Sequence, residues 1–271
     1  MTEKNSRSAR ILAVANQKGG VGKTTTAINL ATSLALDHQS VLLVDVDPQS
    51  NLTSGIGLKG QHAEAGTIYE ALMTDAPPES FVLATQVENL SIIPADRSLT
   101  GAEIELVTVP AREHRLRRVL EPLRSRFDLI FIDCPPSLGL LTLNALVAAD
   151  AVVIPLHCEY FALEGLADLV GTMRRVQSTL NPALDIEGVL LTMYDERTNL
   201  AQLVARDVRE FFKAKVFNTT IPRNVRLGEA PSHGLPAVLY DAKSRGATAY
   251  AALAREVLAR PSAAVPAEET N

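Results

Sequence analysis

The chain alternates short, almost wholly apolar runs with segments whose apolar residues recur at helical spacing. Runs of Val, Ile and Leu are typical of strands that are buried on both faces. We expect strands at residues 10–16, 40–47, 90–95, 127–136, 151–156, 186–194 and 216–222. We expect helices at residues 24–36, 141–150, 162–180, 200–212 and 247–260. This alternation predicts an α/β fold with a mostly parallel, twisted sheet that carries helices on both faces.

The length and composition fit a single domain. The chain has 271 residues, of which 46% are hydrophobic, and it shows no internal repeat or linker. We expect a flexible arm at residues 1–9, one domain at residues 10–260, and a disordered Pro/Ala/Glu-rich tail at residues 261–271.

The sequence also indicates a cytoplasmic protein that does not cross a membrane. The polar start lacks the apolar core of a signal peptide. The most apolar stretch, residues 138–156, is interrupted by Asn144, Asp150 and Pro155. Cys134 and Cys158 lack the spacing of a metal site and fit a reducing compartment.

Charge is unevenly distributed along the chain. The net charge of −5 argues against a protein that is basic over its whole surface. Residues 197–260, however, contain 11 Lys/Arg and five Asp/Glu, so this third can form a basic face or simply a solvated one. Residues 112–126 carry six arginines and two glutamates, and a solvated helix face is the default interpretation there.

The segment KGGVGKTTT, residues 18–26, lies between an expected strand and an expected helix. This is the context of a phosphate-binding loop, in which glycines let backbone N–H groups approach phosphates at a helix N-terminus. Lys23 would reach the β- and γ-phosphates, and the Thr24 hydroxyl would bind Mg²⁺. The G-x-G-x-x-G pattern of a dinucleotide loop is absent. The usual first glycine of the phosphate loop is replaced by Gln17, and Lys18 adds a second cation.

Carboxylates follow two of the expected strands. Asp45 and Asp47 end one strand, and Asp133 ends another after four apolar residues. Carboxylates at this edge of a sheet can hold a metal-bound water or orient a nucleophilic water. The alternative for each is a capped turn at a strand end.

Together, KGGVGKTTT, LLVDVDPQ and FIDCPPSLG resemble the deviant Walker A ATPases, a family that includes ParA/Soj partition proteins, MinD and the nitrogenase iron protein. The segments HCEYFALEGL, TMYDERTNL and IPRNVRLGEAPSHG are similar to the ParA/Soj branch. The resemblance runs from about residue 10 to residue 260.

The resemblance implies that ATP and Mg²⁺ are the cofactors and that the protein hydrolyses ATP slowly. Lys18 would reach across a dimer to the partner's nucleotide, Asp47 would position the attacking water, and Asp133 would contact Mg²⁺ through water. These implied catalytic residues are Lys18, Lys23 and Asp47. The implied ATP-binding residues are Lys18, Gly19, Gly20, Val21, Gly22, Lys23, Thr24, Thr25, Pro222 and Asn224, the last two on the adenine side.

The same resemblance implies an ATP-dependent homodimer that binds double-stranded DNA without sequence preference. Arg197 and Arg226 would contact DNA, and Arg223, Lys243 and Arg245 lie in the same basic third of the sequence. A ParB-type protein would stimulate hydrolysis, and the protein would be associated with the nucleoid.

Two other functions stay open at this stage. A MinD-like regulator would act at a membrane surface, but residues 261–271 contain no Lys or Arg for a basic membrane-binding helix. An orphan ATPase that positions another cargo would lack a ParB-type partner. An iron protein is not expected, because neither Cys134 nor Cys158 lies in a recognisable cluster-ligand segment. A metal at His157, Cys158 and Glu159 is not expected either, because consecutive strand residues point to opposite faces.

Overall fold

The structure is a computed structural model that describes residues 8–260. It contains a seven-stranded sheet in the order β3-β4-β2-β5-β1-β6-β7. The strands are β1 (Arg10–Val14), β2 (Val41–Asp45), β3 (Leu83–Ala84), β4 (Leu90–Ile93), β5 (Leu129–Asp133), β6 (Ala151–His157) and β7 (Asp185–Thr192). In this described sheet β3 pairs antiparallel with β4, and the other pairs are parallel. The predicted α/β fold with a mostly parallel sheet is confirmed.

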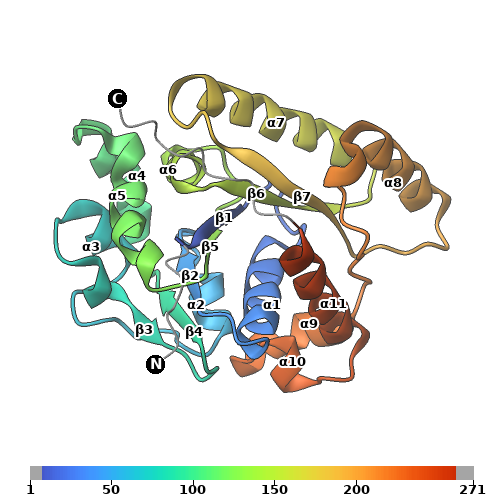
Figure 1. Ribbon diagram of the computed structural model, residues 1–271, viewed down its shortest axis with the longest axis horizontal. Helices are drawn as coiled ribbons and strands as arrows, with labels where there is room; N and C mark the ends of the chain where they lie inside the picture. Colours follow the sequence, from blue (N-terminus) through green and yellow to red (C-terminus); the bar gives the residue numbers. More distant parts are fainter. Residues whose placement is uncertain (1–7, 261–271) are drawn as a thin grey trace.

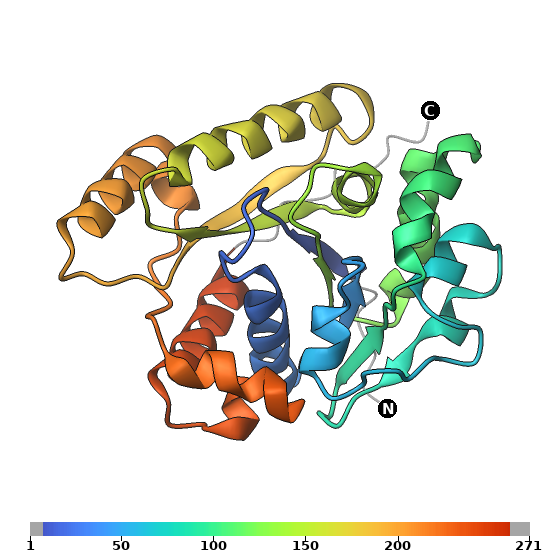
Figure 2. The same ribbon diagram turned by 180° about the vertical axis from the view of Figure 1, so that it is seen from behind.

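Helices cover both faces of the sheet (Figures 1 and 2). One face carries α1 (Lys23–Leu36), α2 (Asn51–Gly55), α9 (Val225–Glu229), α10 (Ala237–Tyr240) and α11 (Arg245–Ala259). The other carries α3 (Ile68–Met73), α4 (Leu99–Glu105), α5 (Arg115–Leu120), α6 (Leu140–Ala148), α7 (Ala162–Thr179) and α8 (Asn199–Phe212). Each face therefore has its own apolar core.

Strand β1 shows why its sequence run is continuously apolar. Ile11 and Ala13 belong to the core under α3 to α8, whereas Leu12 and Val14 belong to the core under α1 and α11. Successive side chains of a strand point to opposite faces, so a strand between two helical layers has no solvent-facing position. The parallel strands all end at one edge, and this edge receives the loops that carry the polar residues.

The strand expected at residues 216–222 is not formed. The segment makes only isolated bridges in the described sheet, at Val216 and Pro222. The backbone N–H groups of Asn218 and Thr219 instead donate to the Glu256 carboxylate of α11, at 2.7 and 2.9 Å. Because a helix side chain takes these donors, the segment cannot continue a strand ladder beside β7.

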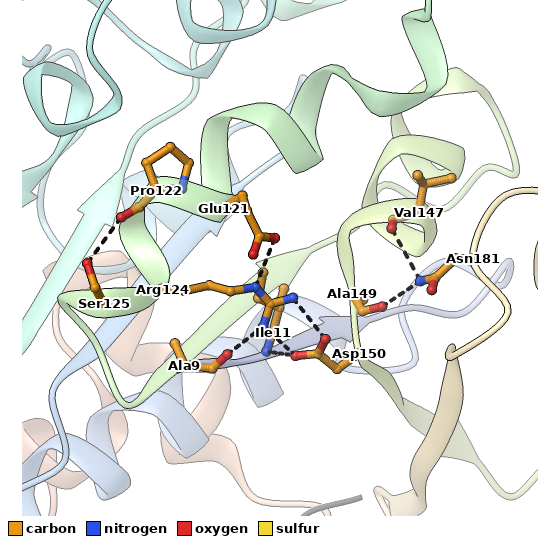
Figure 3. A network of polar contacts seen from close by, with 10 residues as sticks. All are labelled: Ala9, Ile11, Glu121, Pro122, Arg124, Ser125, Val147, Ala149, Asp150 and Asn181. Carbon is orange, nitrogen blue, oxygen red and sulfur yellow. Dashed lines mark hydrogen bonds and ion pairs between the residues drawn. The ribbon is translucent and has the colours of Figure 1, made fainter. Parts of the chain in front are cut away.

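The arginine-rich segment at residues 112–126 is not one solvated helix. It forms α5 between two 3₁₀ turns, and two of its arginines support the fold. The buried Arg115 side chain donates to the Leu72 carbonyl at 2.6 Å. Each terminal nitrogen of the Arg124 guanidinium donates a hydrogen bond to the Asp150 carboxylate at 2.8 Å (Figure 3). The default interpretation is therefore wrong for these two side chains.

The Arg124 network ties together the amino ends of β1 and β6. Arg124 also donates to the Ala9 carbonyl at 2.6 Å, and Asp150 accepts the Ile11 N–H at 2.8 Å (Figure 3). Ala9 is thus packed although it falls in the expected flexible arm. Residues 1–7 of that arm and the expected tail at 261–271 lie outside the described residues.

Every helix within residues 8–260 is too short or too polar to span a lipid bilayer.

Candidate functional site

The loop at residues 15–22 leaves the carboxyl end of β1 and turns into α1. Gly20 and Gly22 have φ angles of 72° and 90°, in the left-handed region that glycine adopts without strain. Gly22 occupies the N-cap position of α1. The first N–H groups of the helix are therefore available to an anion, which the helix dipole also favours.

Two polar side chains fasten this loop to neighbouring strands. The Thr192 hydroxyl, at the end of β7, donates to the Val21 carbonyl at 2.8 Å. The Asn16 amide donates to the Pro155 carbonyl of β6 at 2.8 Å, and its oxygen accepts the Lys18 N–H at 2.9 Å. Sequence reasoning missed Thr192 and Asn16, although each is a polar residue that ends an apolar run.

Lys23 is held inside the site. Its residue is only 7% exposed, and its ammonium donates to the Lys18 carbonyl at 3.1 Å. Burial lowers the pKa of Lys23, while the carboxylates of Asp133 and Asp47 act in the opposite direction. A cation placed between acidic groups and the loop is suited to bind phosphate oxygens.

Asp133 is fully buried at the end of β5 and lies beside Thr24 in the first turn of α1. One of its oxygens accepts the Thr24 hydroxyl at 2.7 Å, and the other has no hydrogen-bond partner among the described residues. Burial raises the pKa of Asp133 well above its usual value, and nearby Asp45 raises it further. Mg²⁺ prefers oxygen ligands, so a hydroxyl and a carboxylate with an unpartnered oxygen fit this ion.

The structure separates the roles of Asp45 and Asp47. Asp45 is fully buried and accepts hydrogen bonds from the Thr53 N–H and hydroxyl, at 2.9 and 2.7 Å. Burial raises its pKa to about 6. Asp47 instead lines the cleft, and one of its oxygens accepts the Gln49 N–H at 2.9 Å. Asp45 thus stabilises the strand end, and Asp47 is the carboxylate that a ligand can meet.

Lys23, Thr24 and Asp47 line one cleft of about 1010 Å³ at the carboxyl edge of the sheet, whereas the buried Asp45 and Asp133 are not among its lining residues. It includes these residues expected from the sequence: Gly19, Gly20, Gly22, Lys23, Thr24, Thr25, Asp47, Pro222 and Asn224. It also includes residues that sequence reasoning missed, among them Gln49, Asn51, Thr192, Met193, Glu229 and Tyr250. Only folding brings these residues together, because they come from α2 and the turn before it, from β7 and the residue after it, and from α9 and α11.

The far wall of the cleft is the segment that leads into α9. The Asn224 side chain caps this helix by accepting the Arg226 N–H at 3.0 Å. Arg223, which we expected to contact DNA, is exposed but also lines this cleft.

Lys18 and Val21 do not line the cleft. Val21 is buried, and the Lys18 ammonium forms an ion pair with the Glu159 carboxylate, just after β6. The Lys18 side chain is 34% exposed and that of Glu159 is 39% exposed. Sequence reasoning did not identify Glu159 as the partner of Lys18, because 141 residues separate them.

The five basic residues expected at DNA are all exposed. Two of them already have acidic partners. Arg197 donates to Asp195 at 2.7 Å, and Arg226 donates to Glu229 at 2.7 Å. Hydrogen bonds from Arg197 lower the pKa of Asp195, and the charge of Arg245 adds to this effect. Arg245 at the start of α11 therefore lies near the Arg197 loop.

Both a protein-family model and curated proteins match most of this chain. A family model described as "AAA domain" matches residues 9–186. "Chromosome partitioning protein ParA" of Myxococcus xanthus is 57% identical over 93% of this chain and 88% of that protein. "Sporulation initiation inhibitor protein Soj" of Bacillus subtilis is 57% identical over 92% of this chain and 98% of that protein.

Solved structures share the fold and include nucleotide complexes. A protein described as cobyrinic acid a,c-diamide synthase from Mycobacterium smegmatis, with a bound ATP analogue and magnesium, is 39% identical with a TM-score of 0.79. The match covers 92% of this chain and 94% of that one. The cell division ATPase MinD of Pyrococcus furiosus is 28% identical with a TM-score of 0.76, and the match covers 92% of this chain and 98% of that one.

The phosphate loop, the hydrogen-bonded Asp133–Thr24 pair and these relatives together show that the chain belongs to the ParA/Soj family of partitioning ATPases, P-loop ATP hydrolases that use Mg²⁺.

Proposed function

We propose that this protein is a DNA-partitioning ATPase in which ATP drives dimerisation and the dimer binds DNA without sequence preference. A ParB-type protein would then stimulate hydrolysis and release the dimer from the nucleoid. The observation that best supports the proposal is the position of α9. Val225, Leu227 and Glu229 of this helix line the cleft, whereas the exposed Arg226 is not among the lining residues. One short helix thus borders the proposed ATP site and also carries one of the basic residues expected to contact DNA.

The chemistry follows from the chain's own groups. Backbone N–H groups of the loop and the Lys23 ammonium would bind the phosphates, and Thr24 and Asp133 would hold Mg²⁺ directly and through water. Bound Mg²⁺ would neutralise charge on the phosphate oxygens. Asp47 would orient the attacking water from the cleft wall. Lys18 would supply a cation to the partner's phosphates, where charge develops during transfer.

DNA binding would use phosphate contacts from Arg197, Arg226, Lys243 and Arg245. DNA phosphates must replace the carboxylates that now pair with Arg197 and Arg226. Such exchange is feasible because ion pairs between exposed side chains are weak. Dimerisation doubles the number of phosphate contacts, so ATP raises DNA affinity.

The test is retention of a random-sequence DNA duplex with ATP, with ADP and without nucleotide, over a series of salt concentrations. We expect strong retention only with ATP. In Arg226→Glu, the loss of one contact per protomer should reduce the salt slope by about 2 for every DNA sequence. Arg175→Glu makes the same charge change on α7, on the opposite face of the sheet, and should bind like the parent.

Other results would contradict the proposal. Equal retention of DNA with ATP and with ADP would contradict the proposal that ATP controls DNA binding. Loss of binding to only some sequences would indicate base recognition. Binding of the ATP form to anionic lipid vesicles but not to DNA would favour the MinD-like function instead.

A further inference from the structure

Lys18 of the loop already has a counter-ion within the single protomer. The Lys18 ammonium pairs with Glu159, which follows β6 and precedes α7. The Glu159 carboxylate also lies 3.5 Å from Nδ1 of His157. The hydrogen bond from Lys18 is the main cause of the lowered pKa of Glu159, so the carboxylate is ionised when it holds the lysine.

The backbone of Lys18 is also restrained, and one restraint depends on the nucleotide site. Its N–H donates to Asn16 at 2.9 Å, and its carbonyl accepts the Lys23 ammonium at 3.1 Å. Lys23 is the residue proposed to bind the β- and γ-phosphates. Phosphates would therefore compete with the Lys18 carbonyl for the Lys23 ammonium, and nucleotide binding would loosen the backbone around Lys18.

The surface beside this ion pair is unusually apolar. Tyr160 and Phe161 follow Glu159 directly, and their residues are 77% and 62% exposed. Their rings pack edge to face with centroids 5.0 Å apart. Two large exposed aromatic residues directly after the counter-ion of Lys18 fit a surface that a second copy of the chain covers.

We infer that Glu159 is a positioning residue that retains Lys18 within its own protomer and thereby opposes dimerisation until ATP is bound. The inference rests on the proposed function, in which Lys18 acts on the partner's nucleotide. ATP loosens the Lys18 backbone through Lys23, and the partner's phosphates then replace Glu159 as the counter-ion of the ammonium. A dimer forms only when two such ion pairs are exchanged.

The test is the dimer dissociation constant, measured by analytical ultracentrifugation with Mg²⁺ and a non-hydrolysable ATP analogue. Glu159→Gln removes the charge and keeps the shape. We expect it to tighten the dimer on the order of tenfold, because two exposed ion pairs, each worth a factor of up to about five, no longer need to be broken. Glu159→Asp keeps the charge and should stay closer to the parent.

Glu164→Gln is the matched control. Glu164 is an exposed carboxylate in the first turn of α7 and makes no ion pair with another residue in the described range 8–260. Its replacement should leave the dimer constant unchanged. Nucleotide affinity at low protein concentration, where the protein is monomeric, separates positioning from damage, because a loop that had lost its structure would bind the analogue more weakly.

Lys18→Ala, alone and combined with Glu159→Gln, distinguishes the inference from the function on which it rests. If Lys18→Ala dimerises like the parent, the trans role of Lys18 is wrong and the inference fails with it. If Lys18→Ala does not dimerise and Glu159→Gln is no tighter than the parent, only the inference is overturned. A gain in Glu159→Gln that disappears in the double variant supports it.

Discussion

The phosphate-binding role of Lys23 gives a prediction whose size follows from the site. Lys23→Met keeps the buried stem and removes the ammonium that faces the loop. A hydrogen bond to a charged group contributes about 1.5–3 kcal/mol. The dissociation constant for Mg-ATP should therefore rise about 10- to 150-fold, because a factor of ten corresponds to about 1.4 kcal/mol.

Thermal unfolding with and without nucleotide measures this change. At a ligand concentration of 100 times the parent's Kd, binding stabilises the parent by about 2.7 kcal/mol. A 100-fold weaker variant would gain only about 0.4 kcal/mol at the same concentration. For a domain of this size about 1 kcal/mol corresponds to 2–4 °C in Tm, so the shift should fall from about 5–11 °C to about 1 °C.

Parent and variant are compared by the shift in Tm that nucleotide causes in each. A change in the Tm of the nucleotide-free variant therefore does not affect the result. Lys59→Met, at an exposed position after α2, is the matched control and should keep the parent's shift. A Lys23→Met protein with the full shift would refute the assignment of the loop to the phosphates.

Three further predictions test other parts of the structure. Asp47→Ala should retain Mg-ATP affinity but lose on the order of 100-fold or more in phosphate release, because a positioned catalytic group contributes about that much; normal turnover would contradict its role. Arg124→Met should lower the free energy of unfolding in urea by about 2–3 kcal/mol, because the bidentate pair with Asp150 is lost. Turnover per folded molecule should persist in that variant, and unchanged stability would show that the network contributes little. Tyr250→Phe should cost about 1 kcal/mol in the same assay, because the buried Thr26 hydroxyl loses its partner at 3.0 Å between α1 and α11; an unchanged midpoint would contradict this.

The relation between sequence and site is clearest for the three carboxylates. Asp45, Asp47 and Asp133 were all visible at strand ends. Their different roles were not, because these depend on residues from other elements. The Asp45 carboxylate accepts a hydrogen bond from Thr53 of α2, and the Asp133 carboxylate accepts one from Thr24 of α1. Such partners come together only when the layers pack.

The sequence did not indicate the short strand β3, and the strand that it predicted at residues 216–222 is not formed. It alone indicated the other six strands in their order along the chain, the glycine-rich loop and the lysine that follows the glycines. Those features are local, since burial on both faces selects apolar runs and a left-handed turn selects glycine. Tertiary structure decided that the N–H groups of Asn218 and Thr219 donate to Glu256, that Arg124 supports the fold, and that Lys18 forms an ion pair with Glu159. Each of these depends on an ion pair or hydrogen bond between segments far apart in the chain, and no local pattern encodes which distant group will satisfy a charge or a backbone donor.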